Sequence, residues 1–136
     1  MKIILLIDDD VDDHDTITQA FYAIDKSVHC LCYSNCDEAI SHLSSHIIPQ
    51  LQCVLIDVHM LRMTGLECLK ALQKIPAMAT VDFIMISSQF REDDLDEFCR
   101  HGAKALCVKP SSWAGYQAMA EMILFDKVQA GRIMSV

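Results

Sequence analysis

The chain has 136 residues, of which 52% are hydrophobic and 22% are charged, a balance typical of one packed globular domain and not of a disordered segment. Its formal net charge of −8 repels phosphate backbones, so we expect no binding to nucleic acid. No apolar run approaches the ~20 residues of a membrane span, and no signal peptide precedes the first apolar run, so we expect a cytoplasmic protein that does not contact membranes.

Short apolar runs alternate with longer amphipathic stretches along the chain. In chain order the predicted elements are strand 2–8, helix 12–24, strand 29–33, helix 37–46, strand 52–57, helix 65–73, strand 82–87, helix 92–101, strand 105–109 and helix 112–129. Several strands are almost continuously apolar (ILLI, CVLI, FIMI and ALCV), which indicates that they are covered on both faces. The helical stretches repeat apolar residues at spacings of three and four, which predicts one buried face for each helix.

This alternation predicts the fold class. Five strands and five helices in turn are typical of an α/β protein with a doubly wound, five-stranded parallel sheet and helices on both faces. We expect one domain over residues 1–130 and a short C-terminal tail over residues 131–136. In such sheets the binding crevice lies outside the carboxyl ends of the strands, so polar residues at those ends are the candidate site residues.

Four of the predicted strands end in a polar residue. The first runs into Asp8 and Asp9, the third ends in Asp57, the fourth in Ser87 and the fifth in Lys109. Several carboxylates at one edge suit Mg²⁺, which takes oxygen ligands, keeps some waters and binds substrate phosphate. A cation, a carboxylate nucleophile, a lysine and a hydroxyl together indicate phosphoryl transfer to an aspartate, with Asp57 as the nucleophile.

The acidic residues that follow the first strand have a simpler interpretation. Asp10, Asp12 and Asp13 lie in a predicted first helical turn, where negative charge is favourable without any metal. A calcium-binding EF-hand loop does not fit, because its sixth position would be Asp13 and not glycine. We expect His14 to be a solvated residue at the helix start, whereas His59 could line the site.

Seven cysteines are distributed through the chain, mostly within apolar runs: Cys30, Cys32, Cys36, Cys53, Cys68, Cys99 and Cys107. Their odd number and their settings favour buried free thiols over a disulfide framework. The cluster CLCYSNC could suggest zinc, but it lacks a CxxC knuckle and a second knuckle elsewhere.

Together with the strand-end residues described above, the sequence resembles the receiver domain of two-component response regulators over about residues 2 to 128. The motifs that carry the resemblance are LLIDDD, VLIDVHMLRMTG, IMISS and LCVKP, in this order on these strands. The resemblance implies a flavodoxin-like fold with strand order 2-1-3-4-5. It also implies that Asp57 is phosphorylated by a sensor histidine kinase or a phosphotransfer protein.

The same resemblance implies roles for the other site residues. Mg²⁺ would bind at Asp8, Asp9, Asp57 and the backbone carbonyl of His59. Ser87 and Lys109 would hold the phosphoryl oxygens, and the bond between Lys109 and Pro110 would be cis. The protein would catalyse only its own phosphorylation and dephosphorylation. Its output would pass to an unknown downstream protein through a surface formed by residues 92–101 and 105–116.

Three departures from the family pattern keep other functions open. Leu61 stands where the family usually has proline, Leu106 where many members have a mobile aromatic residue, and Ser111 where an aromatic residue is usual. A receiver-fold binding module that works without phosphorylation is therefore an alternative. A small phosphatase is a second, because Asp8 and Asp10 have the spacing of its DxD motif, although an aspartate ending the third strand fits it poorly.

Overall fold

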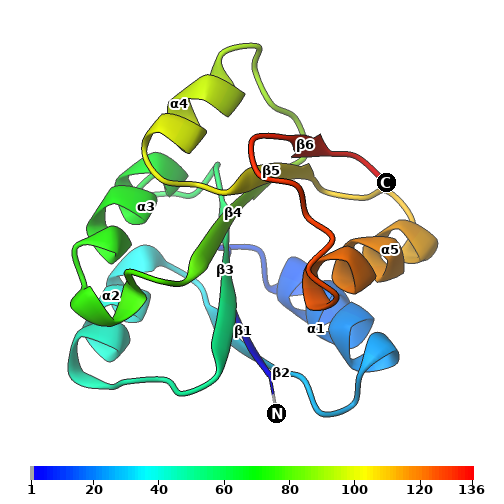
Figure 1. The fold of residues 1–136 in the computed structure, drawn as a ribbon, viewed down its shortest axis with the longest axis horizontal. Helices are drawn as coiled ribbons and strands as arrows, with labels where there is room; N and C mark the ends of the chain where they lie inside the picture. Colours follow the sequence, from blue (N-terminus) through cyan, green and yellow to red (C-terminus); the bar gives the residue numbers. More distant parts are fainter. Residues whose placement is uncertain (1) are drawn as a thin grey trace.

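The computed structural model describes residues 2–136, which form one six-stranded sheet with helices on both sides (Figure 1). The strands are β1 (Ile3–Ile7), β2 (His29–Tyr33), β3 (Leu51–Asp57), β4 (Asp82–Ser87), β5 (Ala105–Val108) and β6 (Ile133–Met134). The α-helices are α1 (Val11–Ile24), α2 (Cys36–Ser45), α3 (Gly65–Gln73), α4 (Asp94–Arg100) and α5 (Trp113–Leu124), and a short 3₁₀ helix, η1, spans Pro76–Met78.

The strand order confirms the predicted topology. The sheet runs β2-β1-β3-β4-β5-β6 and every neighbouring pair is parallel. Helices α1 and α5 pack together on one face, whereas α2, α3 and α4 cover the other (Figure 1). Because all the strands point the same way, their carboxyl ends meet at one edge, as the candidate site requires.

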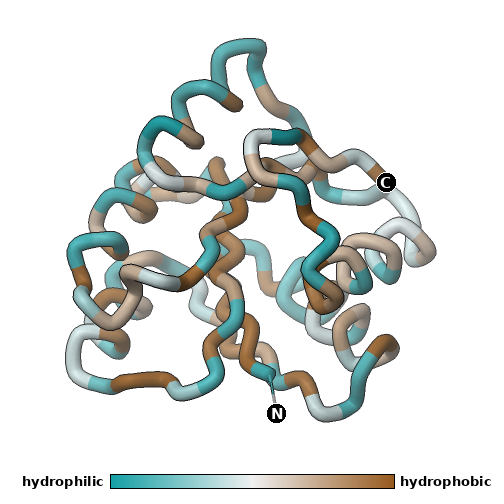
Figure 2. The backbone as a smooth tube through the Cα atoms, in the orientation of Figure 1, coloured by the Kyte–Doolittle hydropathy of each residue, from teal (hydrophilic) through white to brown (hydrophobic). Residues whose placement is uncertain are grey.

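Burial on both faces explains the continuous apolar runs. Figure 2 shows hydrophobic segments concentrated in the central strands. Within β1, Ile4 and Leu6 belong to the core under α1 and α5, whereas Leu5 and Ile7 belong to the core under α2, α3 and α4. All four side chains are fully buried. Side chains of a strand alternate between faces, so a sheet covered twice needs apolar residues at every position.

The C-terminal residues differ from the prediction. The fifth helix ends at Leu124, earlier than expected, and Asp126 adopts a positive φ of 54° that takes the chain out of the helix. Residues expected to form a tail include β6, which pairs with β5 through Leu106–Ile133 and Cys107–Met134. Strand β6 can form because the edge of β5 offers unpaired backbone N–H and C=O groups. It was not predicted because a strand of two residues is too short to show a periodic pattern in the sequence.

Two further expectations are wrong. Among residues 2–136 no peptide bond is cis, so Lys109–Pro110 is trans, the isomer that an X–Pro bond favours without other constraints. A disulfide joins Cys36 to Cys68, so not all seven cysteines are free thiols. The two cysteines lie on neighbouring helices, α2 and α3, and this proximity cannot be read from sequence spacing.

In the part of the chain that the structure describes, no helix is both long enough and apolar enough to cross a bilayer.

Candidate functional site

Three carboxylates converge at the carboxyl edge of the sheet. Asp8 directly follows β1, Asp9 comes next, and Asp57 is the last residue of β3. One oxygen from each of the three side chains lies within 4.8 Å of the others. Asp8 is fully buried and Asp57 is 5% exposed, whereas Asp9 is exposed. The order of the central strands, β1 beside β3, brings these residues together as predicted.

Lys109 lies against this cluster from the end of β5. Its Nζ is 3.0 Å from Asp8 Oδ2 and 3.6 Å from Asp57 Oδ2. Its shortest contact is with Asp13 of α1, to which it donates a hydrogen bond of 2.7 Å. The ammonium side chain is only 13% exposed, so it is a fixed cation among several acids and not a solvated one.

Burial and charge alter the pKa values of these groups in opposite directions. Burial raises the pKa of Asp8 to about 6, against the opposing effects of the Asp10 backbone N–H and of Lys109. Burial also raises the pKa of Asp57, which Lys109 partly offsets. Burial acts to lower the pKa of Lys109, but its bonds to the surrounding carboxylates raise it above its usual value. The lysine therefore stays charged while the two buried acids resist ionisation.

The loop between β3 and α3 closes over the carboxylates. The His59 N–H donates to Asp57 Oδ1 at 3.2 Å, and the Leu61 N–H donates to Asp9 Oδ2 at 3.1 Å. Gly65 begins α3 directly against the end of β3, where an added Cβ would lie 2.6 Å from the Asp57 carbonyl oxygen. A glycine is therefore required for α3 to start this close to the phosphoacceptor candidate.

The fourth strand contributes a hydroxyl that is engaged elsewhere. Ser87 is fully buried, and its Oγ donates to the Gln89 carbonyl at 2.8 Å and accepts from the Gln89 N–H at 3.2 Å. Within residues 2–136, no hydrogen bond joins the Ser87 hydroxyl to Asp57 or Lys109. Its backbone is nevertheless close to the site, because the Lys109 N–H donates to the Ser87 carbonyl at 2.8 Å.

Sequence reasoning missed two contributors from α1. The sequence predicts for Asp13 only a favourable place in the first turn of α1, yet Asp13 is the closest partner of Lys109. His14 was expected to be solvated, but it is partly buried and its Nε2 lies 2.5 Å from the Asp8 carbonyl oxygen. Asp10 behaves as predicted for a helix start, because its side chain caps α1 by accepting from the Asp12 N–H. The sequence does contain a sign of these contacts. Helix α1 starts immediately at the site edge, so the side chains of its first turn lie next to the site.

The residues fit a hard divalent cation. Asp8 Oδ2 is buried and receives no aligned hydrogen bond, although Lys109 Nζ lies 3.0 Å away as an ion pair. An unsatisfied carboxylate oxygen beside two further carboxylates matches the oxygen donors that Mg²⁺ prefers. Asp8, Asp9 and Asp57 are thus the side chains that could hold it.

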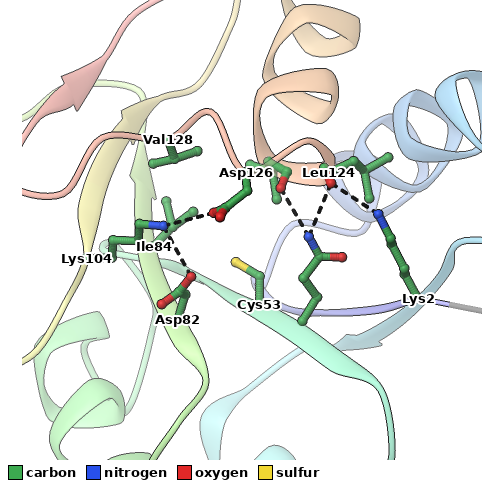
Figure 3. Close-up of a pocket in the computed structure, with 10 residues that line it drawn as sticks. Lys2, Cys53, Asp82, Ile84, Lys104, Leu124, Asp126 and Val128 are labelled. Atoms are coloured by element: carbon green, nitrogen blue, oxygen red, sulfur yellow. Dashed lines mark hydrogen bonds and ion pairs between the residues drawn. The ribbon is translucent and has the colours of Figure 1, made fainter.

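A cavity of about 340 Å³ lies at the opposite end of the sheet (Figure 3). Most of its polar groups are paired: Lys104 bridges Asp82 and Asp126 at 3.3 Å each, and Lys2 donates to the Leu124 carbonyl. The exception among the described residues is Gln52, whose Nε2 donates to the Leu124 carbonyl but whose Oε1 is buried without a partner. It contains none of the predicted site residues. We therefore place the candidate site at the carboxyl edge, on its chemistry and not on cavity size.

Comparison with known proteins identifies the family to which the sequence is similar. The family model described as the response regulator receiver domain matches residues 4–121. No curated protein sequence matches the chain.

Many solved structures are similar to this fold. The chemotaxis protein CheY4 of Vibrio cholerae is 19% identical, with a TM-score of 0.76, and the match covers 94% of this chain and 98% of that one. A response regulator receiver domain from Rhodospirillum rubrum is 17% identical, with a TM-score of 0.79 and coverage of 94% and 96%. The CheX–CheY–BeF3–Mg complex of Borrelia burgdorferi matches at 26% identity and a TM-score of 0.74, covering 91% and 89%.

Proposed function

Because the chain belongs to the response regulator receiver domain family, we propose that it is a phosphoacceptor in a two-component phosphorelay, with Asp57 as the phosphorylated residue. The observation that carries this proposal is the arrangement at the carboxyl edge. The buried Asp57 lies 3.6 Å from the partly buried Lys109 and beside two further carboxylates that could hold a divalent cation.

Each residue has a distinct part in the transfer. A carboxylate oxygen of Asp57 forms the new bond to phosphorus as the phosphorus–nitrogen bond of a phosphohistidine donor breaks. Mg²⁺, when bound by Asp8, Asp9, Asp57 and the His59 carbonyl, would neutralise charge on the transferring oxygens. Lys109 pairs with one phosphoryl oxygen after transfer, because its ammonium already lies next to Asp57.

Ser87 would take part by changing its hydrogen-bond partner. Its hydroxyl is bonded to the backbone of Gln89, so binding a phosphoryl oxygen requires it to release that loop. The loop after β4 and the loop after β3 would then be the segments that respond to phosphorylation. A conformational equilibrium shifts when the phosphoryl group makes contacts in one state that it does not make in the other.

The proposed partners are a sensor histidine kinase or phosphotransfer protein and an unknown downstream protein, with the cytoplasm as the place of action. Three large apolar side chains that are near site residues along the chain are exposed to solvent. Val11 begins α1, Leu61 lies in the β3–α3 loop and Trp113 begins α5. Exposed apolar groups near an active edge suit contact with a protein donor. The chain would catalyse only its own phosphorylation and dephosphorylation.

Incubation with acetyl phosphate and Mg²⁺, followed by intact mass measurement, tests this function. We expect the mass of one phosphoryl group to be added to the wild-type protein and to be absent from Asp57→Asn. Asp9→Ala should lose Mg²⁺-dependent labelling while keeping its circular dichroism spectrum. Normal labelling of Asp57→Asn would refute the assignment of the acceptor, and normal labelling of Asp9→Ala would refute the assignment of the metal site.

One observation favours a second candidate, a binding module that works without phosphorylation. Leu106 is fully buried in the core under α2, α3 and α4, so it cannot swing inward as a switch. In that case a downstream partner would bind the wild-type protein and Asp57→Asn with equal affinity. A partner that binds only the phosphorylated protein would exclude this candidate.

A further inference from the structure

The disulfide between Cys36 and Cys68 stands apart from the other cysteines. It joins the first residue of α2 to the fourth residue of α3, with the two Cα atoms 5.8 Å apart. Cys30, Cys32, Cys53, Cys99 and Cys107 remain thiols. A small scaffold held together by disulfides would pair most of its cysteines, so this single crosslink calls for another explanation.

The crosslink lies one helical turn from the start of α3, where Gly65 packs against the end of β3. The Cys68 N–H donates to the Thr64 carbonyl at 2.9 Å, and Thr64 and Glu67 form a capping box that fixes the start of α3. Gly65, in the same turn, donates to the Val58 carbonyl at 3.1 Å. The disulfide therefore anchors the first turn of α3 to α2, and this turn closes the loop after Asp57.

That loop contacts two of the three site carboxylates. The His59 N–H holds Asp57, and the Leu61 N–H holds Asp9. Met60, between them, is buried in the same core cluster as Cys36 and Cys68. The path from the crosslink to the carboxylates is thus made of backbone hydrogen bonds and buried side chains.

We infer that Cys36 and Cys68 form a reversible redox pair that regulates the phosphoacceptor site. A peroxide oxidises one thiol to a sulfenic acid and releases water. The second thiol then attacks that sulfur, the disulfide forms and a second water leaves. A dithiol reductant returns both thiols by exchange.

The oxidised state should bind the phosphoryl group better. With the disulfide closed, the start of α3 and the loop that it anchors have less freedom to lose when ligands are bound. With the thiols free, the same loop must be ordered by the ligands themselves. This effect on the site rests on the proposed function, whereas the formation of the crosslink does not.

The first experiment counts thiols in the purified 136-residue chain. After mild hydrogen peroxide treatment, denaturation and iodoacetamide, we expect five alkylated cysteines and one peptide pair linked through Cys36 and Cys68. After treatment with dithiothreitol, all seven should be alkylated. Seven alkylated cysteines in the peroxide-treated protein, or a different linked pair, would overturn the inference.

The second experiment measures affinity for beryllium trifluoride with Mg²⁺ in both redox states. We expect the oxidised protein to bind at least roughly fivefold more tightly. The difference should disappear in Cys36→Ala/Cys68→Ala and persist in the matched Cys30→Ser/Cys32→Ser variant. If the double alanine variant does not fold, the single variant Cys36→Ala, which also cannot form the crosslink, provides the same comparison.

The outcomes separate this inference from the proposed function. Equal or weaker binding by the oxidised wild-type protein overturns the regulation but leaves Asp57 as the acceptor. Absence of labelling by acetyl phosphate in both redox states overturns the proposed function and, with it, the regulation, whereas the thiol count still decides whether the crosslink forms.

Discussion

Replacing Asp8 with asparagine should stabilise the folded protein at neutral pH, even though it removes half of an ion pair. Asp8 is fully buried, and its pKa rises from 3.8 to about 6. Keeping this carboxylate ionised in the native state therefore costs about 3 kcal/mol at neutral pH, at ~1.4 kcal/mol for each pKa unit. A neutral asparagine avoids this cost.

Part of the gain is lost to hydrogen bonding. Asp8 Oδ1 accepts from the Asp10 N–H at 2.9 Å, while Oδ2 lies next to Lys109. An asparagine side chain has only one oxygen, so it can face only one of these two donors, which costs about 1 kcal/mol. We expect a net stabilisation of about 1–2 kcal/mol, or a melting temperature higher by roughly 3–8 °C.

The stability gained through Asp8→Asn should depend on pH. The pKa of Asp8 is higher in the folded state than in the unfolded state, so its ionisation destabilises the fold above about pH 6 and has no effect below about pH 4. The advantage of Asp8→Asn should therefore shrink as pH falls through this window. Urea unfolding without Mg²⁺, at several pH values between about 4 and 7.5, measures it.

A matched variant separates burial from net charge. Glu121→Gln removes one exposed carboxylate from α5 and should change stability by less than about 0.5 kcal/mol. A destabilised Asp8→Asn at neutral pH would refute the reasoning, as would a gain that stays constant over the whole pH range.

Three other changes test the parts around the site. Gly65→Ala should destabilise the fold by roughly 2–4 kcal/mol in urea unfolding, because its Cβ would lie 2.6 Å from the Asp57 carbonyl oxygen. Leu61→Pro removes the N–H that holds Asp9, so calorimetric Mg²⁺ affinity should rise, by at most roughly tenfold. Met134→Ala should cost about 1–3 kcal/mol, because this β6 side chain is only 6% exposed.

Neighbouring residues provide the controls for these three variants. Gly131→Asn keeps a positive φ in open space and should be tolerated, unlike the change at Gly65. Met63→Ala lies in the same loop as Leu61 but leaves every backbone N–H in place. Ile133→Ala removes an exposed β6 side chain and should cost less than Met134→Ala. Equal costs for the two β6 variants would mean that β6 does not pack against the core.

The sequence predicted the fold and the central site because both depend on local patterns. Continuous apolar runs identified strands buried on both faces, and parallel topology then brought Asp8, Asp57 and Lys109 to one edge. Each of these residues directly ends or follows its strand. Their meeting therefore needed no knowledge of side-chain packing.

The features that sequence missed depend on contacts between distant segments. Cys36 and Cys68 are 32 residues apart, and only the packing of α2 against α3 makes them neighbours. Strand β6 has two residues and exists because β5 leaves an edge unpaired. Asp13 faces Lys109 because α1 starts directly at the site. None of these has a periodic signature along the chain.

The electrostatic state of the site explains why so many acids are retained around a single lysine. Asp8, Asp13 and Asp57 all lie within 4 Å of the Lys109 ammonium, and Asp9 lies close to two of them. One positive charge cannot compensate them all, and burial raises the pKa of Asp8 and of Asp57. A site with excess buried negative charge is less stable alone than with a divalent cation, so cation binding and stability are linked. The same imbalance that Asp8→Asn would relieve is therefore what would make this edge receptive to Mg²⁺.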